Sequence, residues 1–207
     1  LFTSGATEAN HALFASFARS FPGSVVATGA TDHPSVLEPA RAFFGARARR
    51  LPVTSDGQVD LDSLAEQVSP ADTPPALVSV IAANNEVGTL QPWAEISRLC
   101  RPAGIPFHSD AAQWVGKLPG RNLASACDYL TASTHKFGGP KGVGFLVIPE
   151  DDPVFRSAIG GPQEAGRRAG TEDYPAVAAM VAALEEAARA PAPDHTLRDA
   201  FESRLLA

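Results

Sequence analysis

The Ser-Thr-His-Lys corner at residues 133–136 places an amine beside an imidazole, between two apolar, strand-like runs. The chain has only three lysines, Lys117, Lys136 and Lys141, and its other cations are arginines. A lysine amine is a useful nucleophile when burial or nearby cations lower its pKa. We therefore expect Lys136, between apolar strands and beside His135, to react with a carbonyl group; an exposed lysine in a salt bridge is the alternative.

Residues 3–8, with the sequence Thr-Ser-Gly-Ala-Thr-Glu, precede a helix that we expect to run to about Arg19. Small residues let the backbone approach a ligand, and a helix N-terminus offers free N–H groups and the positive end of the dipole. Ala6 and Thr7 are therefore candidate phosphate contacts. An ordinary tight loop with a hydroxyl cap explains the same residues equally well.

Polar side chains also follow other predicted strands. His33 comes after the strand at 24–28, Asn85 after the strand at 76–82, and Asp110 ends the strand at 105–109, with Gln113 three residues later. Ligands in open α/β sheets gather at the carboxyl ends of the strands. The alternatives are a plain loop histidine and polar residues that cap the next helix.

Taken together, these sites describe one ligand. It has a phosphate for a helix N-terminus, a ring nitrogen to pair with Asp110, a ring face for His33 and an aldehyde for Lys136. Pyridoxal 5′-phosphate (PLP) has all four features, and in PLP enzymes the protein supplies the lysine and the partner of the ring nitrogen.

The elements that must position these residues alternate between strands and helices. Besides the strands above, we expect strands at 48–53, 129–133 and 143–148, and helices at 33–44, 61–68, 92–103 and 174–190. This alternation favours an α/β fold, a mostly parallel sheet flanked by helices. Residues 190–195 (APAPDH) read as a linker, and a further helix is expected from Thr196.

Composition limits the function classes. The chain has 207 residues, 44% of them apolar, and a net charge of −6, which argues against nucleic acid as a direct partner. No apolar run has the length of a membrane span. The two cysteines, Cys100 and Cys127, lack the spacing of a metal site and do not suggest a disulfide framework, so we expect no metal and a cytoplasmic location.

Five motifs carry a resemblance to a known family. They are FTSGATEAN, NNEVGTLQPWAEI, HSDAAQWVGKLP, STHKFGGPKGVG and RRAGTE, in this order. The series resembles that of the NifS/IscS-like cysteine desulfurases, within the class V aminotransferases of PLP fold type I. The resemblance implies that residues 1–190 form a PLP-binding large domain, incomplete at its N-terminus. Residues 191–207 would be a linker and the start of a truncated C-terminal small domain.

The resemblance also implies roles for the candidate residues at the strand ends. Lys136 would form the Schiff base with the cofactor, and Asp110 would keep the pyridine nitrogen protonated. Gln113 and Asn85 would contact the oxygen side of the ring. His33 would stack on the ring face and relay protons.

For the phosphate, the resemblance implies contacts from Ala6, Thr7, Ser133 and His135. Thr171 would reach the phosphate of the neighbouring subunit's cofactor, which implies a homodimer. Read without the resemblance, the segment around Thr171 is an anion-friendly turn or a plain capped loop.

The implied reaction removes sulfur from L-cysteine, leaving L-alanine and an enzyme persulfide for a sulfur-acceptor scaffold protein in iron–sulfur cluster assembly or tRNA thiolation. The family's persulfide cysteine lies well downstream of the lysine, and neither Cys100 nor Cys127 matches it. We therefore expect a fragment lacking both ends, inactive alone.

The alternatives are a selenocysteine lyase acting on L-selenocysteine, another class V enzyme, or a non-catalytic PLP-fold fragment. A phosphate loop at 138–142 is disfavoured, because its spacing is wrong and a strand follows it.

Overall fold

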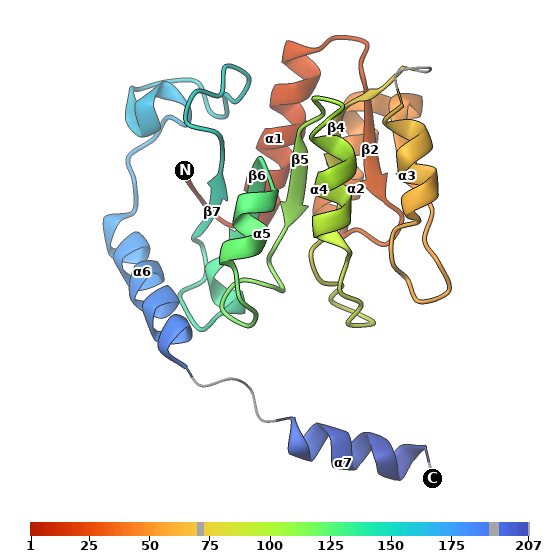
Figure 1. Ribbon diagram of the computed structural model, residues 1–207. Coiled ribbons are helices and arrows are strands. Elements are labelled where there is room, and N and C mark those ends of the chain that lie inside the picture. Colours follow the sequence, from red (N-terminus) through yellow and green to blue (C-terminus); the bar gives the residue numbers. More distant parts are fainter. Residues whose placement is uncertain (70–72, 191–194, 207) are drawn as a thin grey trace.

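The protein forms one mixed sheet with helices on both faces (Figure 1). The computed structural model describes residues 1–69, 73–190 and 195–206. Within these ranges the sheet has seven strands in the order β1-β7-β6-β5-β4-β2-β3. The strands are β1 (Phe2–Thr3), β2 (Val25–Gly29), β3 (Ala48–Leu51), β4 (Pro75–Ser79), β5 (Phe107–Asp110), β6 (Tyr129–Ser133) and β7 (Gly144–Val147).

The five strands from β3 to β6 in this order are parallel to their neighbours, whereas β7 is antiparallel to both β6 and β1. Their parallel direction brings the carboxyl ends of β2, β4, β5 and β6 to one edge of the sheet. The predicted fold, with a mostly parallel sheet flanked by helices, is confirmed. The antiparallel edge was not anticipated.

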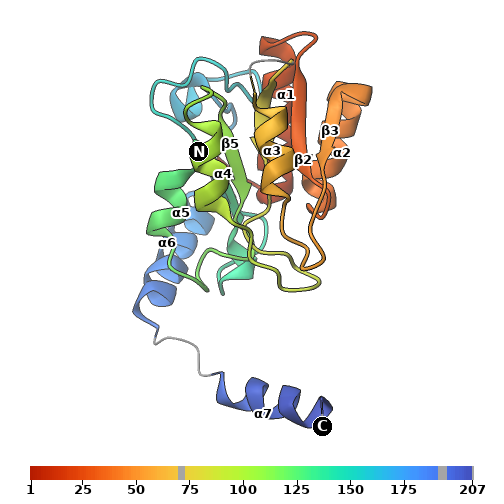
Figure 2. The same cartoon turned by 45° about the vertical axis from the view of Figure 1, so that its right-hand side comes forward.

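The described ranges contain seven α-helices. They are α1 (Ala6–Ser20), α2 (Pro34–Phe44), α3 (Leu61–Gln67), α4 (Trp93–Cys100), α5 (Arg121–Ala126), α6 (Tyr174–Arg189) and α7 (Thr196–Leu205), with single 3₁₀ turns at Gly45–Arg47, Thr134–Lys136 and Gln163–Gly166. Helices α1 and α2 lie on one face and α3, α4 and α5 on the other, as Figures 1 and 2 show from two sides. Helix α7 lies apart from the sheet in both views.

Successive side chains in the central strands point alternately into two hydrophobic cores, one on each face of the sheet. Val26 of β2 and Leu77 of β4 face the α1/α2 core, and their neighbours Ala27 and Val78 face the α3/α4 core. Both faces are therefore buried, as expected for central parallel strands.

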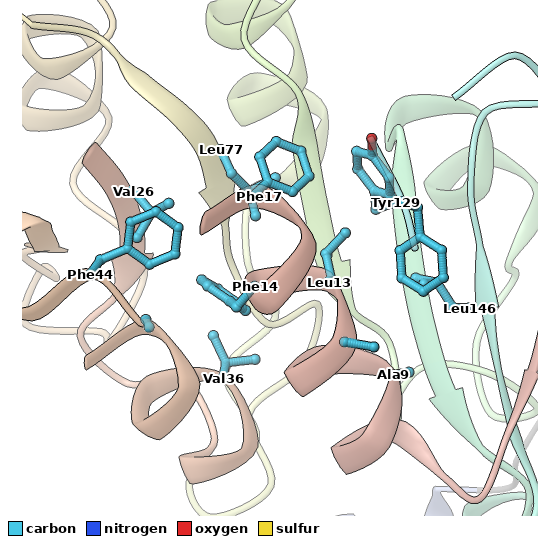
Figure 3. Packing of buried hydrophobic residues seen from close by; sticks show 13 residues of the cluster. Ala9, Leu13, Phe14, Phe17, Val26, Val36, Phe44, Leu77, Tyr129 and Leu146 are labelled. Atoms are coloured by element: carbon cyan, nitrogen blue, oxygen red, sulfur yellow. The ribbon is translucent and has the colours of Figure 1, made fainter. Parts of the chain in front are cut away.

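Helix α1 is the centre of the first core (Figure 3). Its residues Leu13, Phe14 and Phe17 are at most 1% exposed and pack toward Leu77, Tyr129 and their neighbours. The apolar positions recur at helical spacing, so one stripe of α1 is held against the sheet. This packing fixes the N-terminus of α1 at the edge where the parallel strands end.

Several element boundaries differ from those expected. Helix α4 ends at Cys100 rather than near residue 103, and Gly104, with φ 66°, follows its end. Helix α5 was not predicted, because its six residues bury only Leu123 and leave no periodic signal. Most of the predicted linker, residues 191–194, lies outside the described residues. Within the described ranges no helix has the length and apolar character needed to cross a bilayer.

Candidate functional site

A cavity of about 230 Å³ lies at the edge where β2, β4, β5 and β6 end. Nine of the ten predicted site residues line it, and only Thr171 does not. The nine are Ala6, Thr7, His33, Asn85, Asp110, Gln113, Ser133, His135 and Lys136; Ser35, Ile81 and Ala112 complete the lining.

The first turn of α1 forms one end of this cavity. The Ala6 N–H donates to Ser133 Oγ at 2.7 Å, which joins the helix start to the end of β6. Gly5 precedes the helix with φ 152° and offers no side-chain cap, and a Cβ on it would lie 3.3 Å from Ser133 Oγ. The N–H groups of this turn have no partner within the helix, so this end of the cavity suits an anion.

Asp110 is the buried carboxyl group of the cavity, with 2% of its surface exposed. Its Oδ1 accepts the Ala112 N–H at 3.0 Å and its Oδ2 accepts Asn10 Nδ2 at 2.9 Å. Burial raises the pKa of Asp110, and these two hydrogen bonds and the nearby His33 partly oppose the rise. No lysine or arginine of the described ranges forms an ion pair with it, so the carboxyl group is open to a cationic ligand in the cavity.

His33 is held at the start of α2 by its own helix turn. Its Nδ1 accepts the Ser35 N–H at 3.1 Å and lies 2.8 Å from Ser35 Oγ. Because Nδ1 accepts a backbone N–H, the ring proton sits on Nε2, and Nε2 has no protein partner in the described part of the chain. The ring thus keeps one nitrogen free for chemistry in the cavity.

Lys136 lies in the 3₁₀ turn after β6 and is exposed, so the apolar strands on either side do not bury it. Strand β6 ends at Ser133, and the turn carries the lysine to the cavity rim. The salt-bridge alternative is not supported either, because no ion pair of Lys136 is present among the described residues. Burial and the charge of Lys136 together lower the pKa of Lys117, which also bonds Gln113 Oε1.

The two neighbouring amides after β4 separate into different roles. Asn84 ties its own loop: its Nδ2 donates to the Thr31 carbonyl at 3.0 Å and its Oδ1 accepts the Glu86 and Val87 N–H groups. Asn85 is exposed and lines the cavity. Only the second amide is therefore available to a ligand.

Thr171 lies outside the cavity. It is exposed in the loop after Gly170, whose φ is 106°. This loop is joined to α1 by the ion pair between Arg168 Nε and Glu8 Oε1 at 3.2 Å. A role for Thr171 in a neighbouring subunit's site stays a prediction.

Sequence reasoning missed Asn10 and Ser35. Asn10 is fully buried and donates from Nδ2 to both Asp110 and Ser35 Oγ. An asparagine on the buried stripe of α1, one residue after Ala9 and three before Leu13, was the available signal, because a buried amide needs partners. Ser35 had no comparable signal, since a serine near a helix start normally serves as a cap.

The residues present fit PLP. An anion-binding helix start, a buried carboxyl group without a cationic partner and an accessible lysine surround one cavity. The Thr134 hydroxyl beside Lys136 is buried without a hydrogen-bond partner, so the turn retains an unused polar atom. No metal-ligand cluster of three or more His, Cys, Asp or Glu side chains is found among the described residues.

Comparisons with known proteins identify the family of the chain. The family described as aminotransferase class-V matches residues 1–193. The mitochondrial cysteine desulfurase of Drosophila melanogaster is 43% identical over 153 residues, which are 72% of this chain and 32% of that protein. A NifS-like protein superposes with a TM-score of 0.82 at 34% identity, over 91% of this chain and 52% of its own. The structure of SspA in complex with cysteine gives a TM-score of 0.82 at 28% identity, over 98% of this chain and 58% of its own.

The chain spans about a third of the Drosophila relative and about half of the NifS-like structure. Over that span, the resemblance to NifS/IscS-like cysteine desulfurases and to PLP fold type I is confirmed. The chain belongs to the class-V aminotransferase family.

Proposed function

We propose that this chain forms the cofactor site of a PLP-dependent cysteine desulfurase, which converts L-cysteine to L-alanine and transfers the sulfur to an acceptor. The observation that carries the proposal is the meeting of Lys136, Asp110 and His33 in one cavity beside the start of α1. The similarity to cysteine desulfurases supports the choice of reaction, and the cysteine complex of SspA supports the choice of substrate.

The cavity residues divide the work of holding the cofactor. The first turn of α1, with Ser133 and His135, would bind its phosphate, and Lys136 would hold its aldehyde. Asp110 would keep a positive charge on the ring nitrogen. PLP, when bound, supplies an electron sink for the bond-breaking steps.

Two side chains of the cavity, Lys136 and His33, would move protons during the reaction. Lys136 Nζ lies at the cavity rim, where the side chain is free to move between ligand and solvent. His33 Nε2 lacks a protein partner among the described residues, so it can accept or donate a proton on the ring side. Asn85 and Gln113 orient the ligand from the side nearer the loop after β4.

Sulfur transfer requires a nucleophilic thiolate that this chain does not supply at its two cysteines. Burial raises the pKa of Cys100 and that of Cys127 to about 12. We therefore assign the persulfide to a cysteine elsewhere in the whole protein. The homodimer, the sulfur-acceptor scaffold, the link to iron–sulfur cluster assembly and the cytoplasmic location belong to this proposal.

Reductive labelling tests the proposal directly. The protein is incubated with PLP, reduced with borohydride and digested, and the modified lysine is located by mass spectrometry. Modification of Lys136 alone, lost in Lys136→Ala, supports the assignment, and release of L-alanine from L-cysteine by the intact protein then tests the reaction. Modification at Lys117 or Lys141 in place of Lys136 would refute the cofactor site.

A further inference from the structure

A series of hydrogen bonds runs beneath the cavity from the middle of the sheet to Asp110. Ser79 Oγ lies 2.8 Å from His108 Nδ1, and His108 Nε2 lies 3.2 Å from Thr131 Oγ1. Thr131 Oγ1 donates to Asn10 Oδ1 at 2.7 Å. All four side chains are fully buried, so water cannot replace any of these bonds.

The direction of the series is set at its Asp110 end, where Asn10 Nδ2 donates to Oδ2, so that Asn10 Oδ1 faces the Thr131 hydroxyl. Burial lowers the pKa of His108 to about 3, so its ring is neutral and each nitrogen has a single role. The one hydroxyl proton of Thr131 goes to Asn10, so Thr131 Oγ1 must accept from His108 Nε2. His108 Nδ1 then accepts the proton of Ser79.

One orientation of the Asn10 amide satisfies both of its sides. With Oδ1 facing the Thr131 hydroxyl, Nδ2 faces the other side, where it donates to Asp110 Oδ2 at 2.9 Å and to Ser35 Oγ at 3.0 Å. A flipped amide would set its oxygen against Asp110 Oδ2, which suits only the protonated carboxyl group, whereas the hydrogen bond from Nδ2 favours the ionised form. The Nδ2 group has two protons, and both are used.

Ser35 extends the same order to His33. Since Ser35 Oγ accepts from Asn10, its one proton has two acceptors nearby, His33 Nδ1 at 2.8 Å and the Asp110 carboxylate, whose pKa a hydrogen bond from Ser35 also lowers. The backbone N–H of Ser35 holds His33 Nδ1 as an acceptor in either case. The free nitrogen of the ring, Nε2, carries the proton.

We propose that Asn10 is a positioning residue that orients the Asp110 carboxylate through Nδ2, and that the Thr131 hydroxyl supports the orientation of the Asn10 amide. Asn10 does not line the cavity, so it acts through Asp110. The inference rests on the proposed PLP site for its effect on cofactor binding, but the order of the hydrogen bonds is independent of any cofactor.

A matched pair of variants at Thr131 tests the proposal. Thr131→Val keeps the shape of the side chain and removes the hydroxyl, whereas Thr131→Ser keeps the hydroxyl. Ser97→Ala is the control for loss of a buried hydroxyl, because Ser97 Oγ donates to the Ala126 carbonyl on the other side of the sheet. Asn10→Ala removes the amide itself.

Two measurements are made on the intact protein. Imidazole ¹⁵N spectra of the cofactor-free protein report the tautomers of His33 and His108, and titration with PLP gives its dissociation constant. We expect Thr131→Val to lose the single Nε2–H form of His108, because the hydroxyl that accepts this proton is gone. Thr131→Val and Asn10→Ala should both weaken PLP binding about tenfold, the effect of one hydrogen bond to a charged group. The His33 signals should not change, since the Ser35 backbone N–H still holds Nδ1 as an acceptor. Thr131→Ser and Ser97→Ala should match the parent protein in both.

The outcomes separate this inference from the proposed function. If the parent protein binds no PLP at Lys136, the proposed function fails, and the histidine spectra still decide the order of the hydrogen bonds. If Thr131→Val leaves the His108 signals and the PLP dissociation constant equal to those of Thr131→Ser, the positioning role of Asn10 is refuted. If Asn10→Ala does not fold, the comparison of Thr131→Val with Thr131→Ser decides whether the proposal holds.

Discussion

Gly144, the first residue of β7, lies against the loop that starts α1, and its replacement by alanine should disturb the anion-binding end of the cavity. A Cβ at Gly144 would lie 2.6 Å from the Ala132 carbonyl oxygen and 2.6 Å from Gly5 Cα. Both are backbone atoms, so no side-chain rotation relieves the contact. The φ of Gly144 lies outside the left-handed region, so steric overlap is the main effect of Gly144→Ala.

The size of the effect follows from these distances. Ordinary van der Waals contact begins at 3.4 Å, so the backbone must separate by about 0.8 Å. Ala132 is held in the β6–β7 pairing, which leaves the loop at Gly5 to move. The bond from the Ala6 N–H to Ser133 Oγ, now 2.7 Å, would then approach the ~3.5 Å at which a hydrogen bond is lost.

Overpacking of this kind costs about 1–3 kcal/mol, and the lost hydrogen bond costs about 1 kcal/mol more. We therefore expect Gly144→Ala to lower the free energy of unfolding by about 2–4 kcal/mol. Displacement of the first turn of α1 should also weaken PLP binding at least about tenfold, since phosphate contacts depend on the helix start.

Urea denaturation and PLP titration measure the two effects. Gly120→Ala is the matched control, because a Cβ there meets nothing within 4 Å and its φ of −88° suits alanine. This control should be neutral or slightly stabilising. Equal stability and equal PLP affinity for Gly144→Ala and Gly120→Ala would refute the reasoning, because the close approach would then impose no constraint.

Three further predictions use other buried groups. Burial raises the pKa of Asp32 to about 8, so the native carboxyl group keeps a proton that the unfolded chain loses above its ordinary value of 3.8. The free energy of unfolding should therefore fall as pH rises from about 4 to about 8, by at most ~1.4 kcal/mol per unit of pKa shift. Asp32→Asn should remove this dependence on pH. If urea denaturation gave parallel stability–pH profiles for the two proteins, this prediction would be contradicted. Burial raises the pKa values of Cys100 and Cys127 to about 12, so iodoacetamide should modify neither thiol in the folded protein and both thiols in urea. Peptide mass spectrometry measures the modification. Rapid modification of either thiol in the folded protein would contradict the prediction. Phe14→Ala should lower the free energy of unfolding by about 3–5 kcal/mol in urea denaturation. Phe21→Ala, which changes a side chain that is 42% exposed, should lower it by less than half as much. Similar losses at both positions would argue against the core shown in Figure 3.

Much of the fold could be predicted because its signals are local. The run at 76–82 is continuously apolar, as a central parallel strand with two buried faces must be. Asp110 and Ser133 are the last residues of β5 and β6, so polar side chains at the ends of the predicted strands mark the edge of the sheet. The parallel direction of the strands then brings these ends together, which is why nine predicted residues line one cavity.

Other features could not be predicted because they depend on contacts between distant segments. The exposure of Lys136 depends on where the β6–β7 pairing ends, since the 3₁₀ turn after Ser133 carries the lysine outward. Helix α5 has too few buried residues for any periodic pattern. The pairing of β1 with β7 joins residues more than 140 positions apart, which no local pattern encodes.

The sequence by itself determined the alternating elements, the family and the types of residue at the strand ends, because each of these is written in short, contiguous patterns. Only the tertiary structure decided how the buried polar groups are paired. Asn10 is one amide on a helix until the fold places it between Thr131 and Asp110, 121 and 100 residues away. Burial then removes water as an alternative partner, and the geometry of the sheet alone sets which group donates to which.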